Sequence, residues 1–173
     1  ILAFYLQKGF LQVKVGKPQV TYDQKAITIN LPIEEGRQFK VGKLDIRGDL
    51  ISPKEELFKL VKIYVGEILN REKVRESVSN LTDQYADKGY AFVDVTPQTI
   101  IHKEDDLVDL IFEIQRGSQV YFERINILGN TKTRDKVIRR ELKAVEGELY
   151  NLGVLKKSRE NLTRLGYFKE VNL

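Results

Sequence analysis

The chain has 173 residues, of which 42% are hydrophobic and 31% are charged, and this composition is typical of a folded rather than a disordered protein. The formal net charge is +4, but the 29 basic and 25 acidic residues are mixed along the chain, so we expect no nucleic-acid partner. The absence of cysteine excludes disulfides, thiolate metal sites and a cysteine nucleophile, and no apolar run approaches the roughly 20 residues that a membrane-spanning helix needs.

The first part of the chain is predicted to hold the end of a helix and a hairpin. Residues 1–8 carry apolar side chains at helical spacing and end at Gly9, a residue that favours the left-handed conformation closing many helices. Alternating apolar residues predict strands over 10–15 and 26–33, joined through the polar residues 22–25. Because the chain opens inside a helical pattern, we expect it to be a segment of a longer protein.

The middle part reads as strand, helix, helix, strand, strand. A strand is predicted over 39–47, then a short helix over 52–64 that begins with serine and proline, and then a longer helix over 70–88 that begins at an asparagine. Alternation predicts two further strands over 90–95 and 107–114. Residues between these strands are mostly polar and are expected to form a connection.

The last part repeats the beginning of the middle part. A strand is predicted over 120–128, a helix over 136–145 and a second helix closing at Gly166, after which a further strand begins. Equivalent residues keep a spacing of 81 positions, which indicates a repeated module. The equivalent pairs are Gly36 and Gly117, Gly48 and Gly129, Gly66 and Gly147, Asn70 and Asn151, Ser77 and Ser158, and Leu81 and Leu162.

The complete middle module is predicted to be an α+β, two-layer unit. Residues 107–114 are apolar on one face and partly apolar on the other, so this third strand should be central. Pro97 follows the second strand, and proline is tolerated at sheet edges because it cannot donate to a ladder. We therefore expect a three-stranded mixed sheet in the order 1-3-2, covered on one face by two helices.

Catalytic and cofactor motifs are missing from the sequence. The single histidine, His102, stands among charged residues and is expected to be a solvated loop residue. No phosphate-binding loop, zinc-protease motif, nucleophile elbow or dinucleotide fingerprint is present, so we expect neither an enzyme nor a bound cofactor or metal.

Exposed sheet edges are the remaining candidates for binding. A strand edge offers backbone donors and acceptors to any extended peptide, although neighbouring modules could instead cap these edges. The residues predicted to form partner-binding edges are Leu11, Val13, Val15, Ala91, Phe92, Val93, Asp94 and Val95.

Four sequence stretches resemble POTRA domains, the polypeptide-transport-associated modules of the Omp85 superfamily. They are E-G-E-L-Y-N at 146–151, R-E-N-L-T-R-L-G-Y-F at 159–168, I-L-G-N-T at 127–131 and R-R-E-L at 139–142. The resemblance implies tandem POTRA modules. Residues 1–37 would be the C-terminal part of a module like the third, 38–117 a complete module like the fourth, and 118–173 the N-terminal part of a module like the fifth.

The resemblance also implies a function. It is that of a periplasmic scaffold, attached to the outer membrane of a Gram-negative bacterium, that receives unfolded outer-membrane proteins and passes them to a membrane barrel of the same chain. It implies docking of accessory lipoproteins at Arg139, Arg140 and Glu146, whereas the middle module departs from the motif with Val65 in place of Glu146.

Two alternatives stay open. One is the POTRA segment of another Omp85 transporter, of the two-partner secretion or TamA-like kind. The other is an α/β nucleic-acid-binding module that uses the basic residues.

Overall fold

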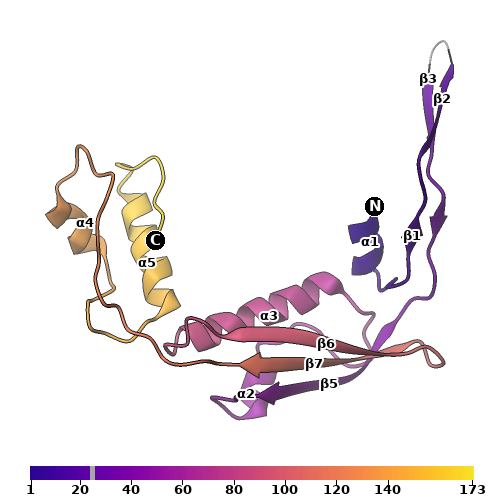
Figure 1. The fold of residues 1–173 in the computed structure, drawn as a ribbon, viewed down its shortest axis with the longest axis horizontal. Coiled ribbons are helices and arrows are strands. Elements are labelled where there is room, and N and C mark those ends of the chain that lie inside the picture. The colour runs from indigo at the N-terminus through magenta and orange to yellow at the C-terminus, as the bar shows by residue number, and fades with distance from the viewer. Residues whose placement is uncertain (24–25) are drawn as a thin grey trace. The chain divides into compact units, whose positions relative to one another are not determined.

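The computed structural model describes residues 1–23 and 26–173, and the chain separates into two compact units (Figure 1). The first unit comprises Ile1–Arg47, Lys54–Val78 and Thr96–Glu113, and the second comprises Gly48–Pro53, Ser79–Val95 and Ile114–Leu173. The elements are α1 (Leu2–Gln7), β1 (Lys14–Val15), β2 (Gln19–Asp23), β3 (Ala26–Asn30), β4 (Ile33–Glu34), β5 (Lys40–Gly48), α2 (Lys54–Phe58), α3 (Arg71–Ala86), β6 (Asp94–His102), β7 (Leu107–Gln115), α4 (Asp135–Glu141) and α5 (Leu152–Arg164).

The hairpin of the first unit is built differently from the prediction. The strands of 10–15 and 26–33 were expected to pair through a connection over 22–25, but β2 pairs with β3, and the short β1 pairs with β4. Tyr22 and Asp23 therefore belong to a strand, while Gln24 and Lys25 lie outside the described residues. Pro32 explains the break between β3 and β4, because proline has no N–H to continue a ladder.

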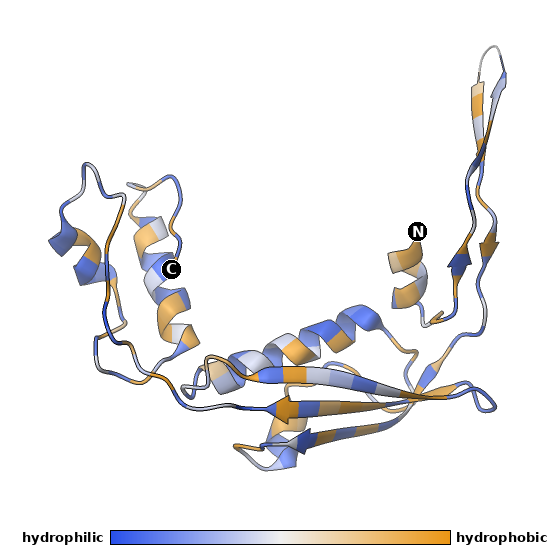
Figure 2. Cartoon of the chain, in the orientation of Figure 1, coloured by the Kyte–Doolittle hydropathy of each residue, from blue (hydrophilic) through white to orange (hydrophobic). Residues whose placement is uncertain are grey.

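The sheet of the middle part confirms the predicted order, because its strands lie as β5-β7-β6. Lys40 N–H donates to Asp106 O and Asp49 N–H donates to Ile114 O, so β5 and β7 run parallel. The central strand β7 is hydrophobic over most of its length, with a few polar residues between (Figure 2). Its inward residues are at most 1% exposed, namely Val108, Leu110, Phe112 and Ile114.

The edge strand β6 begins and ends later than predicted. Residues 91 and 92 form a turn in which Ala91 N–H donates to Gly89 O, so the strand starts only at Asp94 and then continues through Pro97 to His102. His102 is therefore a strand residue, and its Nε2 lies 3.0 Å from Asp109 Oδ2 of β7. This hydrogen bond is the main reason that the pKa of Asp109 is lowered.

The long helix α3 confirms its prediction, whereas α2 is shorter than expected. Asn70 Oδ1 accepts hydrogen bonds from the backbone N–H groups of Glu72 and Lys73, at 2.9 and 3.2 Å, and so caps α3. The helix α2 ends at Phe58 rather than near Tyr64. The chain can leave the helix because the fully buried Ser77 Oγ accepts from the N–H of Lys62 at 2.8 Å.

The same hydrogen bond from a backbone N–H to a buried serine hydroxyl recurs in the second unit. Buried Ser158 Oγ accepts from Lys143 N–H at 2.8 Å, and α4 ends at Glu141 instead of Val145. The strand predicted over 120–128 forms no ladder, apart from an isolated bridge between Tyr121 and Leu149. Its repeat counterpart β5 pairs with β7, whereas the described residues of 118–173 place no strand beside this segment.

Across residues 1–23 and 26–173, no helix combines the length and the apolar character that crossing a membrane requires.

Candidate partner-binding surfaces

The strand β6 is a sheet edge, because among the described strands β7 is its one neighbour in the order β5-β7-β6. Eight of its nine residues are exposed, and only Val95, at 6% exposure, is buried. Ile100 and Ile101 are 49% and 41% exposed, so apolar side chains accompany the backbone of this edge. Such an edge can add an extended strand, and Pro97 interrupts its row of donors at one position.

The structure moves most of the predicted edge residues of the middle part out of the strand. Ala91 and Phe92 lie in the turn before β6, and Val93 follows that turn, whereas Asp94 and Val95 are the first two residues of β6. Sequence reasoning missed the larger part of the edge, 96–102. The sequence feature that could have predicted a strand over 96–102 is the pair of isoleucines after Pro97, since a polar connection would not be expected to contain them.

The predicted edge of the first part is also reduced. Leu11 lies in a turn, Val13 precedes β1, and Val15 is the second residue of β1. This strand has only two residues, Lys14 and Val15, which pair with Glu34 and Ile33. A two-residue strand offers much less backbone to a partner than β6 does.

The structure brings Arg139 and Glu146 together around the main chain of Ile125. Glu146 Oε1 accepts from Ile125 N–H at 2.9 Å, and Arg139 Nη2 donates to Ile125 O at 3.0 Å. The two side chains also form an ion pair, with 3.7 Å between Arg139 Nη1 and Glu146 Oε1, and each remains about half exposed. Both backbone groups of Ile125 are thus satisfied by a charged pair that still faces solvent.

The third predicted docking residue, Arg140, points to a different acceptor. Its Nε lies 3.2 Å from Glu141 Oε1, and its side chain is 69% exposed. Asp135 joins the cluster instead, because its carboxylate lies 3.6 Å from Arg139 Nε one helical turn away. The sequence signal for this addition was the i,i+4 spacing of Asp135 and Arg139 in α4.

The middle module has apolar residues at the equivalent positions. Phe58 and Val65 stand 81 positions before Arg139 and Glu146, and Val65 is 61% exposed. The middle module therefore lacks this charged pair, as expected from the departure at Val65.

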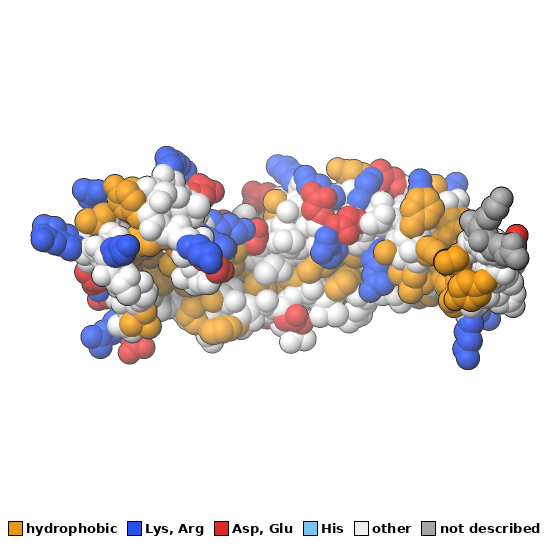
Figure 3. Space-filling model, turned by 90° about the horizontal axis from the view of Figure 1, so that it is seen from above, with side chains coloured by type: hydrophobic (Ala, Val, Ile, Leu, Met, Phe, Trp, Pro, Cys, Tyr) orange, Lys and Arg blue, Asp and Glu red, His pale blue; other side chains and the backbone are white. Residues whose placement is uncertain are grey.

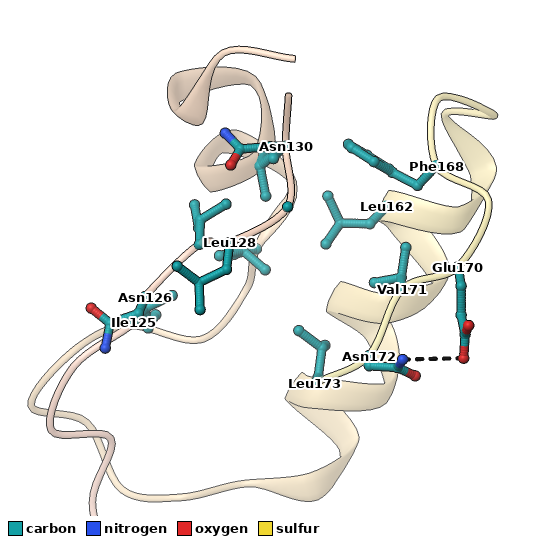
Figure 4. Close-up of a pocket in the computed structure, with 14 residues that line it drawn as sticks. Ile125, Asn126, Leu128, Asn130, Leu162, Phe168, Glu170, Val171, Asn172 and Leu173 are labelled. Carbon is teal, nitrogen blue, oxygen red and sulfur yellow. Dashed lines mark hydrogen bonds between the residues drawn. The ribbon is translucent and has the colours of Figure 1, made fainter. Parts of the chain in front are cut away.

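A slot lies beside the unpaired segment in the second unit (Figure 4). It has a volume of about 250 Å³. Leu128, Leu162 and Phe168 border it, together with the last residue, Leu173, and Asn172 Nδ2 donates to Glu170 Oε1 at 3.1 Å nearby. Because β7 fills the equivalent place beside β5 in the middle module, the slot has the position of a third strand.

Charged side chains of both signs are interspersed on the face seen in Figure 3. Lysine and arginine side chains lie beside aspartate and glutamate side chains over α3, for example Arg75 beside Glu72. A nucleic-acid interface requires a concentrated basic surface, so this face gives that alternative no support.

The repeat, the 1-3-2 sheet and the open strand edge define a class of small α+β modules arranged in tandem. The POTRA family model, described as a surface antigen variable number repeat, matches residues 39–117 and 120–173. The chain therefore belongs to the POTRA family.

Two named relatives are similar to this chain over nearly its whole length. The chain is 32% identical over 176 residues to the outer membrane protein assembly factor BamA of Nitratidesulfovibrio vulgaris, a match that covers 99% of this chain and 22% of the relative. It is 33% identical over 171 residues to BamA of Neisseria meningitidis serogroup B, covering 97% of this chain and 22% of the relative. The chain thus spans about a fifth of the length of these relatives.

A solved structure has the same fold. The third to fifth POTRA domains of BamA from Haemophilus influenzae superpose with a TM-score of 0.86 at 20% identity, over 99% of this chain and 68% of that one. The module boundaries at 37 and 117 stay a prediction.

Proposed function

We propose that this chain is the periplasmic part of an outer-membrane protein assembly factor in a Gram-negative bacterium. In this role it is a scaffold and receptor without catalysis, and it passes unfolded outer-membrane proteins to a membrane barrel of the same protein. Membership of the POTRA family and the likeness to BamA support the proposal. The observation that carries it is the exposed edge strand β6, Asp94–His102.

Strand addition at β6 is the proposed mode of client binding. An unfolded barrel strand is an extended chain whose side chains alternate between apolar and polar, while its backbone groups need partners. An edge strand supplies those partners largely independently of the client's sequence, because main-chain hydrogen bonds give the affinity. Ile100 and Ile101 add exposed apolar contacts on this edge.

Proline substitutions at the adjacent residues Thr99 and Ile100 test this mode. Backbone N–H groups of consecutive strand residues point in opposite directions, so one proline removes a ladder bond to β7 and the other removes a donor of the open edge. We expect one variant to lower the melting temperature. The other should keep it but bind a ten-residue peptide, copied from a transmembrane strand of an outer-membrane protein, about tenfold more weakly.

Calorimetric titration of the peptide and circular dichroism of each variant provide the measurements. Equal peptide affinity for wild type and for the variant with unchanged melting temperature would refute strand addition at β6. Titration of DNA and RNA at low salt serves as the control for the nucleic-acid alternative, which requires affinity that falls steeply with salt.

For the second surface, we propose that a BamD-like accessory lipoprotein docks on the last module at Arg139 and Glu146, with Arg140 beside them. The half-exposed charged pair supports this, because it presents both signs of charge in a fixed geometry set by Ile125. Complementary charges on a partner would gain specificity from such a pair.

The substitution Glu146→Lys is expected to weaken lipoprotein binding about tenfold or more, because it removes one charge and leaves Arg139 facing another cation. Biolayer interferometry with the purified lipoprotein measures the effect. The matched control is Val65→Lys at the equivalent position of the middle module, which should leave binding unchanged. Equal binding of Glu146→Lys and wild type would contradict the proposed site.

A further inference from the structure

The two junctions between successive modules each contain the same kind of backbone hydrogen bond, which we call the joint. At the first junction, Phe39 N–H donates to Gly9 O at 3.0 Å, and at the second, Val120 N–H donates to Gly89 O at 3.0 Å. A glutamine reinforces each joint: Gln38 Nε2 donates to Lys8 O at 2.8 Å, and Gln119 Nε2 donates to Lys88 O at 3.0 Å. The two junctions therefore have these two hydrogen bonds in common.

The second junction carries an additional clamp between the end of α3 and the start of α5. Asp87 Oδ1 accepts from the backbone N–H of Gly153 at 2.7 Å, and Asp87 O accepts from Asn151 Nδ2 at 2.8 Å. Asp83 Oδ2 lies 2.5 Å from Lys156 Nζ. Three polar contacts from one helical face thus join the two helices, and two of them involve a carboxylate, which strengthens hydrogen bonds.

The first junction lacks the residues that build this clamp. Counting from the shared Lys-Gly pair, Asp83 and Asp87 are replaced by Ala3 and Gln7 of α1. In the part of the chain that the structure describes, neither residue has a hydrogen bond or ion pair to α3. The counterpart of Lys156 is Arg75, which bonds to Glu72 of its own helix.

A groove takes the place of the clamp. It measures about 660 Å³ and separates α1 from the N-terminal half of α3 within the first unit. Leu2, Leu6, Val74, Val78 and Pro97 line it with apolar side chains, beside the polar Gln7 and Arg75. Among the described residues, no hydrogen bond or ion pair crosses this groove. The end of α1 is held by the joint at Gly9 and Phe39, by the bond from Gln38 to Lys8 O and by the bridge of Phe10 with Gln38.

We propose that the first junction is a hinge and the second a locked joint, and that the aspartates at 83 and 87 set this difference. A hinge needs a few element-terminal residues that absorb backbone rotation, and Gly9, with φ of +84°, occupies such a position at the end of α1. The groove beside the first joint leaves room for the helices to approach or separate. At the second joint the same motion would break the contacts of Asp87 and Asp83.

Double electron–electron resonance on the whole chain tests this directly, because the sequence has no cysteine and accepts labelled cysteine pairs without background. Labels at Lys17 and Glu76 span the first junction, and labels at Glu76 and Arg159 span the second. We expect the distance distribution across the first junction to be about twofold broader than that across the second. A pair at Lys17 and Thr28, both in the hairpin region, reports whether that region is itself ordered.

Exchange of the clamp residues provides matched variants. The double variant Ala3→Asp with Gln7→Asp should narrow the distance distribution across the first junction about twofold. The double variant Asp83→Ala with Asp87→Gln should broaden the distance distribution across the second junction about twofold. Equal widths in the unmodified chain would overturn the proposal. So would a first distribution that stays broad after both aspartates are installed, because the breadth would then come from the hairpin region rather than from the joint.

Discussion

Replacing Gly48 by alanine is expected to lower the free energy of unfolding by about 3 kcal/mol or more, a large fraction of the roughly 5 to 15 kcal/mol that stabilises a typical domain. Gly48 has φ of +96°, a conformation that costs an L-residue about 1 to 2 kcal/mol. An added Cβ would also lie 2.1 Å from the carbonyl oxygen of Ile114, where β7 runs beside the end of β5. Because that oxygen belongs to the main chain of the central strand, the contact cannot be relieved by a side-chain rotation.

Two other glycines allow the stability cost of the clash to be distinguished from the cost of the backbone strain. Gly66 lies in the same module with φ of +85°, and Gly129 is the repeat equivalent of Gly48 with φ of +80°, yet an added Cβ at either would meet nothing within 4 Å. We expect Gly66→Ala and Gly129→Ala to cost about 1 to 2 kcal/mol each, from strain alone. Urea denaturation followed by circular dichroism measures all three variants. Equal losses at Gly48 and Gly66 would show that β7 does not crowd this position.

The contrast between Gly48 and Gly129 also shows what the sequence could predict. The spacing of 81 residues and the apolar pattern of β7 were sufficient for the module and for its sheet order, because both depend on local periodicity and on the position of Pro97. The pattern over 120–128 is as strand-like as that of β5. Pairing, however, is non-local, and a strand without its partner forms no ladder.

The boundaries of β6 were missed for a related reason. Residues 90–95 alternate as a strand would, but the turn bonds after Gly89 take up the first of these residues. Hydrogen bonds between backbone groups in a turn depend little on which side chains are present. The prediction from alternating residues therefore started the edge strand four residues too early.

The candidate sites were predictable only in part. Arg139 and Glu146 were expected from the resemblance of their motifs to POTRA domains, and the structure places them together. Their shared contact with the main chain of Ile125 could not be expected, because every residue carries the same backbone groups. The difference between the junctions also could not be predicted from the sequence. That Ala3 and Gln7 stand in place of aspartates matters only because the structure shows the contacts of Asp83 and Asp87.

The second large effect is expected at Tyr85, whose side chain is completely buried at the end of α3. Its hydroxyl donates to Asp49 O at 3.0 Å and accepts from Ile51 N–H at 3.4 Å, so it satisfies two backbone groups of the segment after β5. Burial raises the pKa of Tyr85, in keeping with a neutral hydroxyl that donates to Asp49 O. Tyr85→Ala should therefore lower the free energy of unfolding by about 3 to 5 kcal/mol, because it leaves a cavity as well as unsatisfied groups.

Tyr85→Phe isolates the hydroxyl, since the ring remains and only the two hydrogen bonds are lost. Its expected cost is about 1 to 2 kcal/mol, which follows from leaving two part-buried backbone groups without this partner. Tyr90 provides the matched control: its ring lies 6.2 Å from that of Tyr85, but its hydroxyl accepts only from the exposed Arg116 Nη1 at 3.3 Å. Tyr90→Phe should cost less than about 0.5 kcal/mol. If Tyr85→Phe proved equally mild in urea denaturation, water would be satisfying Asp49 and Ile51, and the hydroxyl would not hold the segment after β5 in place.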